Sequence, residues 1–71
     1  MPIVINLGVI LAKRKMKGKA LAAEIGITEQ NLSLLRSGKV KGLRFSTLDK
    51  ICEILDCQPG DIIEYVPKEE D

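Results

Sequence analysis

Two glycines that end two short amphipathic segments constrain this fold more than any other feature of the sequence. Residues 19–25 and 29–37 each place apolar side chains at helical spacing, and Gly26 and Gly38 follow the inward-facing residues closely. Glycine just past a helix supplies the left-handed residue that closes the last turn. The side chains expected to face inward are Leu21, Ala22, Ile25, Leu32 and Leu35. The sequence therefore predicts two short helices packed on a shared core.

The connection between these helices is short, Gly26-Ile27-Thr28. Gly26 allows a sharp turn, and Ile27 is expected to pack between the helices. Thr28 suits the N-cap of the second helix because its hydroxyl can accept a free backbone N–H of the first turn. A short turn that contains glycine joins two helices steeply in a DNA-binding helix-turn-helix. The spacing is typical of that motif.

Further short elements are predicted on both sides of this pair. They are a strand at 3–5, a helix at 7–15 after Asn6, a helix capped by Ser46 that reaches Leu55, a turn or single helical turn at 58–61, and a strand at 62–66. Ser46 with Asp49 three residues later has the pattern of a capping box. The predicted fold class is mainly α, a compact bundle of four or five helices with two short terminal strands. These strands can pair within one chain or across two.

The length and composition exclude several classes of function. Seventy-one residues allow one small domain, which we place at 1–67, followed by an acidic tail at 68–71. The chain has no histidine and two cysteines, so we expect no metal site. Phe45 and Tyr65 are the only aromatic residues, too few for a single-strand stacking platform. No nucleophile–base pair or phosphate-cradling glycine loop is present, so we expect no enzyme activity and no cofactor.

The sequence also indicates a cytoplasmic protein with reduced thiols. Its longest apolar run, residues 3–12, is shorter than a membrane span and is broken by Asn6 and Gly8. It lacks the charged region and cleavage site of a signal peptide. Cys52 and Cys57 lie among apolar neighbours, where a thiol behaves as a small hydrophobe. We therefore expect neither a membrane partner nor a disulfide.

A modest net charge of +1 conceals a strong asymmetry along the chain. Residues 1–44 carry nine basic and two acidic side chains, whereas residues 45–71 carry two basic and eight acidic ones. Such a basic segment suggests a nucleic acid or another anionic surface as partner. Ordinary solvation, or attraction between the two halves, explains the asymmetry equally well from composition alone.

Several motifs together resemble one family of regulators. They are Leu21-Ala22, Gly26-Ile27-Thr28, Leu32-Ser33, Ser37-Gly38, the run Arg44-Phe45-Ser46-Thr47-Leu48-Asp49-Lys50-Ile51-Cys52, and the run Leu55-Asp56-Cys57-Gln58-Pro59-Gly60-Asp61-Ile62-Ile63. This ordered set, which covers nearly the whole chain, resembles the Xre/Cro-type helix-turn-helix regulators of a small bacterial subgroup. The resemblance implies a lambda-repressor-like bundle that binds duplex DNA, usually as a dimer.

The sequence departs from that family at two positions. Gly18 stands where relatives commonly have a glutamine that contacts phosphate or supports the recognition helix. That contact is lost or replaced, by Lys17, by Lys19 or by backbone N–H groups of the helix start. Arg36 stands where relatives often have an acidic residue, and its role is left open.

The helix at 29–37 is the predicted reader of the major groove. Gln30 can pair with adenine, as can Asn31 if it faces outward, and Glu29 can accept from cytosine or cap the helix. Leu34 can touch a thymine methyl or add packing. Basic side chains on either side are expected on phosphates. The predicted DNA-binding residues are Lys17, Lys19, Thr28, Glu29, Gln30, Asn31, Ser33, Leu34, Ser37, Lys39, Lys41 and Arg44.

The resulting hypothesis is that the protein is a homodimeric, sequence-specific transcriptional regulator. Between repression and activation, we expect repression. We expect Lys13, Arg14 and Lys15 to be a solvated helix face, and no small-molecule effector is evident. Candidate dimer contacts are the strands at 3–5 and 62–66. The alternative is a protein-interaction or antitoxin-like module on the same scaffold, with DNA binding weakened or lost. Salt-dependent duplex binding separates these two hypotheses.

Overall fold

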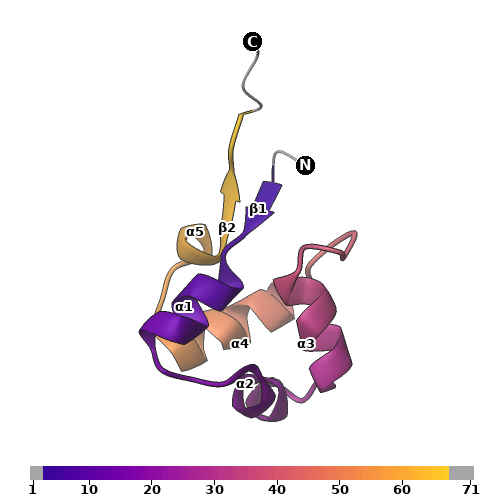
Figure 1. Ribbon diagram of the computed structural model, residues 1–71, viewed down its shortest axis with the longest axis vertical. Helices are drawn as coiled ribbons and strands as arrows, with labels where there is room; N and C mark the ends of the chain where they lie inside the picture. Colours follow the sequence, from indigo (N-terminus) through magenta and orange to yellow (C-terminus); the bar gives the residue numbers. More distant parts are fainter. Residues whose placement is uncertain (1–2, 68–71) are drawn as a thin grey trace.

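The computed structural model describes residues 3–67, which form a helical bundle with a short two-stranded ribbon projecting from one end (Figure 1). In chain order the elements are β1 (Ile3–Ile5), α1 (Leu7–Lys13), α2 (Gly18–Ile25), α3 (Glu29–Arg36), α4 (Phe45–Leu55), α5 (Pro59–Ile62) and β2 (Ile63–Tyr65). The mainly helical fold class is confirmed. The acidic tail predicted at 68–71 lies outside the described residues.

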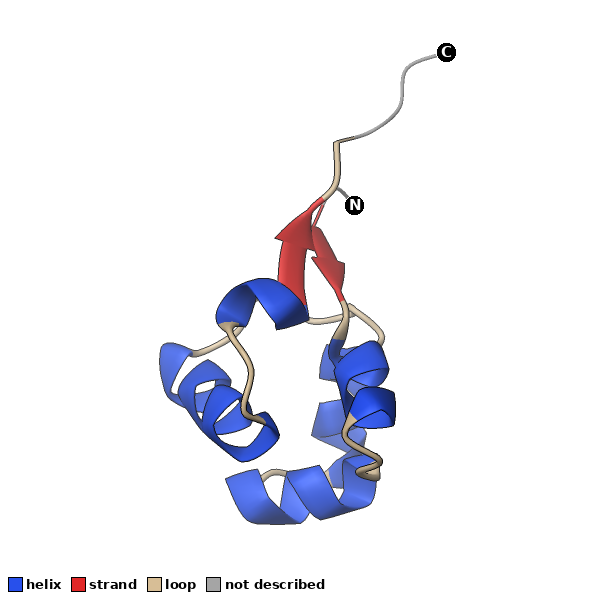
Figure 2. Ribbon diagram, turned by 90° about the vertical axis from the view of Figure 1, so that its left-hand side faces the viewer, coloured by secondary structure: helices blue, strands red, loops and turns tan. Residues whose placement is uncertain are grey.

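The terminal strands pair with each other within one chain, antiparallel, as the red ribbon of Figure 2 shows. Ile5 is opposite Ile63 near the helices, and Ile3 is opposite Tyr65 at the far end. The backbone N–H of Asn6 donates to the carbonyl of Ile62 at 2.6 Å and continues the pairing. The second strand is shorter than predicted, because Ile62 instead ends α5 and is fully buried.

One apolar core joins all five helices of the described residues. Its buried members are Leu7, Ile10, Leu11, Leu21, Ala22, Ile25, Leu32, Leu35, Leu48, Ile51, Leu55 and Ile62. The five inward residues predicted for α2 and α3 are all in this set. Ile27 is half-buried and packs against it, as the turn geometry required. Burial of these side chains holds short helices that would be marginal alone.

The first helix is shorter than the predicted 7–15. It ends at Lys13, and Lys15 adopts a left-handed conformation with φ 54°. The Met16 N–H donates to the Leu11 carbonyl at 3.0 Å, so the chain folds back at this point. Met16 then packs against the core. Tertiary packing of Met16 therefore overrides the helical propensity of the lysine-rich segment.

The predicted caps of α1 and α4 are wrong. Asn6 occupies the N-cap of α1 but makes no side-chain cap; its Nδ2 donates to Glu64 Oε1 at 2.8 Å across the ribbon. The N-cap of α4 is Arg44, so Ser46 lies inside the helix. The Arg44 carbonyl accepts from the Leu48 N–H at 3.0 Å, which starts the helix earlier than the Ser46 pattern suggested.

Arg14 is exposed, as predicted, and it also ties the first helix to the end of the fourth. Its Nε donates to the Leu55 carbonyl at 2.7 Å, and its Nη2 donates to the Asp56 carbonyl at 2.9 Å. Asp56 itself is left-handed, with φ 50°. The last carbonyls of a helix have no partner within the helix. Arg14 supplies hydrogen-bond donors to these carbonyls from a distant segment. Its positive charge also interacts favourably with the negative end of the helix dipole.

Candidate nucleic-acid interface

The geometry of the candidate interface is set by the α2–α3 turn. Gly26 follows α2 with φ 83°, and the N–H groups of Gly26 and Ile27 both donate to the Ala22 carbonyl, at 2.9 and 3.0 Å. Thr28 then caps α3, because its Oγ1 accepts from the Asn31 N–H at 3.0 Å. The predicted Thr28 cap is confirmed. The start of α3 is fixed relative to α2 by these contacts.

Helix α3 has one anchored face and one open face. Leu32 and Leu35 are buried and fasten it to the core. The other side chains of α3 that were predicted to bind DNA are exposed, and Leu34 keeps 41% of its surface accessible. The exposed residues of α3 are Glu29, Gln30, Asn31, Ser33, Leu34 and Arg36. A helix anchored from behind presents such side chains as a rigid row.

The end of α3 closes as the glycine pattern predicted. Gly38 has φ 76°, and the Lys39 N–H donates to the Leu34 carbonyl at 3.0 Å. Ser37 Oγ donates to the same carbonyl, also at 3.0 Å. Ser37 is exposed, but this bond directs its hydroxyl proton into the helix end. The Ser37 hydroxyl can therefore only accept a further hydrogen bond.

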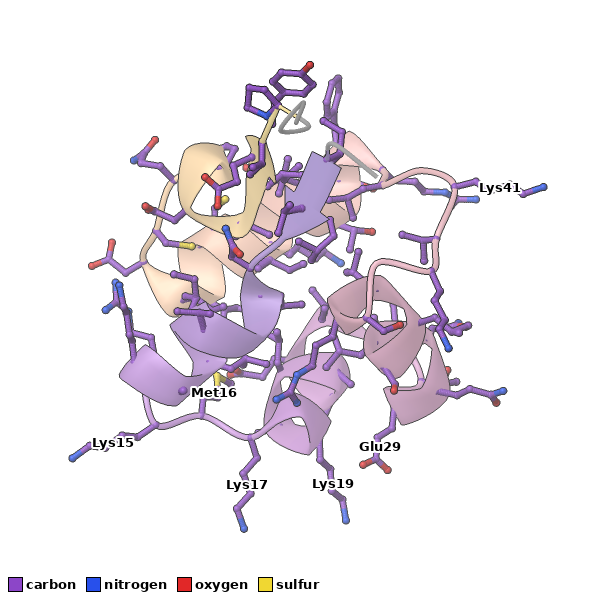
Figure 3. The ribbon with its side chains drawn as sticks, turned by 45° about the horizontal axis from the view of Figure 1, so that its top comes forward. Lys15, Met16, Lys17, Lys19, Glu29 and Lys41 are labelled. Carbon is purple, nitrogen blue, oxygen red and sulfur yellow. The ribbon has the colours of Figure 1, made fainter. Side chains whose placement is uncertain are left out.

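Predicted phosphate ligands lie at both ends of α3. Figure 3 shows Lys17 and Lys19 projecting from the start of α2 on the same side as Glu29, while Lys41 projects from the loop after α3. All five predicted phosphate ligands are exposed: Lys17, Lys19, Lys39, Lys41 and Arg44. The structure thus brings Lys17 and Lys19 beside α3 on one flank and puts Lys41 on a different flank.

An open cleft lies between the start of α2 and α3. Its volume is about 290 Å³, and it is lined by Gly18, Lys19, Glu29, Leu32, Ser33 and Arg36. A Cβ built on Gly18 would come within 3.3 Å of Leu32 Cδ2 and 3.7 Å of Arg36 Nη1. The absent side chain at position 18 therefore relieves a tight contact with Leu32, and Arg36 lies at ordinary contact distance from the same position. Sequence reasoning left the role of Arg36 open, because contact of α3 with both α1 and α2 has no sequence signature.

Residues 6–68 match the family described as the Cro/C1-type HTH DNA-binding domain. This chain belongs to that family. A relative, the uncharacterised HTH-type transcriptional regulator YozG of Bacillus subtilis (strain 168), is 57% identical over 65 residues, which cover 92% of this chain and 77% of YozG. The crystal structure of a candidate DNA-binding protein from Bacteroides fragilis aligns with a TM-score of 0.78 at 26% identity. That alignment covers 87% of this chain and 98% of the other.

This Cro/C1-type domain has a second open groove, on the opposite half of its sequence. The groove measures about 570 Å³ and is lined by Phe45, Ser46, Leu48, Asp49, Cys52, Cys57, Gln58 and Pro59. Cys52 and Cys57 are free thiols there. Burial raises the pKa of the Cys57 thiol, and the neighbouring Cys52 raises it further. Both effects keep Cys57 neutral, so it is a poor nucleophile.

Metal-ligating clusters and membrane-spanning helices are absent from the part of the chain that the structure describes. Within residues 3–67 no three metal-ligating side chains come together. None of the helices in that range is long and apolar enough to cross a membrane. The exposed face of α3 and its flanking lysines are therefore the candidate site of this Cro/C1-type domain.

Proposed function

We propose that this protein is a sequence-specific regulator that binds duplex DNA with α3 in the major groove. The observation that carries the proposal is the division of α3 into a buried apolar face and an exposed polar one. Membership of the Cro/C1-type family and the regulator YozG as a relative support it. In helix-turn-helix proteins the second helix reads base edges with residues near its N-terminus.

Direct readout is assigned to the first two turns of α3. Gln30 and Asn31 can each donate to N7 and accept from N6 of adenine, and Glu29 can accept from cytosine N4. Leu34, exposed at the following turn, can contact a thymine methyl. Thr28 keeps its cap and offers its hydroxyl proton outward. Ser33 lies further along the helix and can donate to a phosphate oxygen of the DNA backbone, whereas Ser37 can only accept a hydrogen bond, because its hydroxyl donates to the Leu34 carbonyl.

We assign the affinity for duplex DNA to the basic side chains on both sides of α3. Lys17, Lys19, Lys39, Lys41 and Arg44 are exposed and free to contact phosphates. Each neutralised phosphate releases counterions, so binding weakens as salt rises. These contacts position α3 without reading sequence.

We further propose that the protein acts as a homodimer on a site with two half-sites. One recognition helix reads few base pairs, and two-fold dimers place two such helices about 34 Å apart. The exposed apolar residues of the ribbon support a contact between copies, because Ile3 is 52% and Tyr65 is 65% accessible. Both edges of a two-stranded sheet are open to pairing with another chain.

Occupancy of the DNA is the simplest mode of action for such a protein. Residues 3–67 form the helical bundle and its short ribbon, and a bound dimer excludes other proteins from the same stretch of DNA. We therefore propose repression, in the cytoplasm where bacterial DNA lies. A promoter-fused reporter that rises when Gln30 is replaced would agree with repression, whereas a reporter that falls would indicate activation.

The decisive experiment is a salt series of fluorescence anisotropy on a labelled random-sequence duplex and on a duplex selected from a random library. Gln30→Ala should weaken the selected duplex by about 1–3 kcal/mol and relax one position. Lys41→Ala should weaken both duplexes alike and reduce the salt slope by about one unit. Lys50→Ala, on exposed α4 surface, is the control. Absence of any salt-dependent binding by the wild type would exclude the DNA function.

A further inference from the structure

We propose that Arg36 binds a phosphate of the DNA backbone in the α2–α3 cleft, and that the missing side chain of Gly8 leaves room for its guanidinium. The proposal rests on the DNA-binding function above and adds a contact residue that neither the sequence motifs nor the recognition-helix pattern assigned. Arg36 is the last residue of α3, and its side chain turns back toward α1 and α2 instead of following the exposed face.

Two glycines, on α1 and α2, lie next to the guanidinium. A Cβ on Gly8 would come within 3.1 Å of Arg36 Nε and 3.5 Å of Arg36 Nη2. A Cβ on Gly18 would come within 3.7 Å of Arg36 Nη1. Two helices therefore approach the same guanidinium through positions that carry no side chain. An alanine at position 8 would make the guanidinium shift, because the contact there is tight, whereas an alanine at position 18 would touch it at ordinary distance.

Gly8 is costly for the helix that contains it. Glycine inside a helix is less favourable than alanine by about 1 kcal/mol, and Gly8 has an ordinary helical backbone with no positive φ. Its backbone conformation therefore does not require glycine. The neighbouring Arg36 side chain is the feature of the structure that an alanine at this position would disturb.

The guanidinium has donors to spare. The side-chain hydrogen bonds within residues 3–67 involve Asn6, Arg14, Thr28, Ser37, Asp61 and Glu64, and none uses Arg36. Arg14 shows the contrast, since two of its nitrogens are committed to carbonyls. A planar guanidinium with uncommitted N–H groups suits the bidentate recognition of phosphate oxygens.

The surroundings favour a phosphate rather than a base. Arg36 shares its cleft with Lys19 and Ser33, a second cation and a hydroxyl donor. Glu29 also lines the cleft and opposes an anion there. Because Arg36 is at the C-terminal end of α3, away from the base-reading turns, its partner is the backbone that borders the groove. The two cations at the cleft offset the single carboxylate.

The test compares Arg36→Ala with wild type and Lys50→Ala in the anisotropy assay, on a random duplex of about 20 base pairs and on the selected duplex. We expect Arg36→Ala to bind both duplexes about tenfold more weakly and to lose about one unit of salt slope. Binding and slope equal to those of Lys50→Ala would overturn the Arg36 contact while leaving the DNA function intact. A wild type that binds neither duplex would overturn both proposals.

A second variant separates contact from folding. Gly8→Ala should keep or raise thermal stability, through better helix propensity, and still weaken binding to both duplexes by shifting the guanidinium. Arg36→Lys should keep the salt slope and recover part of the affinity, because it retains the charge without the planar fork. If Gly8→Ala is stable and binds both duplexes like wild type, the proposed role of Gly8 in leaving room for Arg36 is wrong. If Glu29→Gln restores binding to Arg36→Ala fully, the role of Arg36 is to neutralise Glu29, and the phosphate contact is wrong.

Discussion

Two arginines of the same basic segment have different roles because their neighbours differ. Arg14 donates to the carbonyls of Leu55 and Asp56, so its charge stabilises the end of α4. Arg36 lies over two glycines and keeps its donors uncommitted. Residue type alone predicts neither role. The role of each arginine depends on whether backbone carbonyls or open space lie within reach of its guanidinium.

Arg14→Ala should lower the free energy of unfolding by about 1 kcal/mol, since exposed hydrogen bonds to a charged group contribute modestly. Chemical denaturation measures this change, and duplex affinity measured well below the denaturation midpoint should stay as in wild type. Lys13→Ala, one residue earlier and also exposed, is the matched control. Equal stability of the two variants would show that the Arg14 bonds contribute nothing in solution.

Asp56→Gly should raise the free energy of unfolding by about 0.5–1 kcal/mol. Asp56 holds φ 50°, a left-handed conformation that glycine adopts without steric cost. The change also removes a negative charge from the C-terminal end of α4, where the helix dipole disfavours it. Thermal unfolding with Glu53→Gly as a comparison is the measurement. Glu53 lies within α4, so there the same change should destabilise instead.

The Cys57 thiol should make folding stability depend on alkaline pH. Its folded-state pKa is raised above the ordinary value of 9.0, first by burial and then by Cys52. The folded state therefore holds the proton more tightly than the unfolded chain, so this stability is complete below pH 9 and declines as pH rises through the raised pKa. Denaturation midpoints from pH 8 to 10.5 should fall less in Cys57→Ala than in wild type. Parallel declines would contradict the raised pKa.

Element by element, the helices follow from local rules far better than the strands do. Periodic leucines and glycine stops predict α2 and α3 closely, because those signals are local. The Ser46 cap is wrong because α4 begins two residues earlier, with Arg44 as its N-cap. The pairing of β1 with β2 joins opposite ends of the chain, so no local pattern contains it. The sequence predicts the lysines near α3 as phosphate ligands. It does not predict a role for Arg36, because that role depends on how α3 packs against α1 and α2.

Thr28→Ala should destabilise α3 specifically. The lost bond from the Asn31 N–H to Thr28 Oγ1 is worth about 1 kcal/mol at an N-cap. Because α3 carries the predicted base contacts, affinity for the selected duplex should fall together with stability. Thr28→Ser keeps the hydroxyl and should restore both quantities. Amide hydrogen exchange at the first turn of α3 reports the effect directly, and unchanged exchange there would exclude the cap.

At the scale of the whole molecule, the helical bundle and the two-stranded ribbon have different roles. The helices bury the core and present α3, while the ribbon projects from the far end with Ile3 and Tyr65 exposed (Figure 1). Such apolar exposure on a projecting element is characteristic of contact with another chain. The dimer proposed above therefore leaves the open face of α3 unobstructed.

Replacing Ile3 and Tyr65 together by serine should convert the dimer to a monomer. Analytical ultracentrifugation measures the change, and the salt slope on a two-half-site duplex should fall toward half its wild-type value. Val9→Ser is the control, since Val9 is an exposed apolar residue on α1. A double variant that remains dimeric would move the interface elsewhere, with Phe45, 86% accessible, as the next residue to replace.

The strand register also has a mechanical consequence. Ile3 and Tyr65 are paired at the tip of the ribbon, so the chain enters and leaves the domain at one point. Tension applied between these two positions pulls the strands apart one pair at a time, from the tip toward Ile5 and Ile63. Pairs that open in sequence resist less force than pairs that must all shear at once. The ribbon should therefore yield first and absorb extension while the helical core, with α3, keeps its shape.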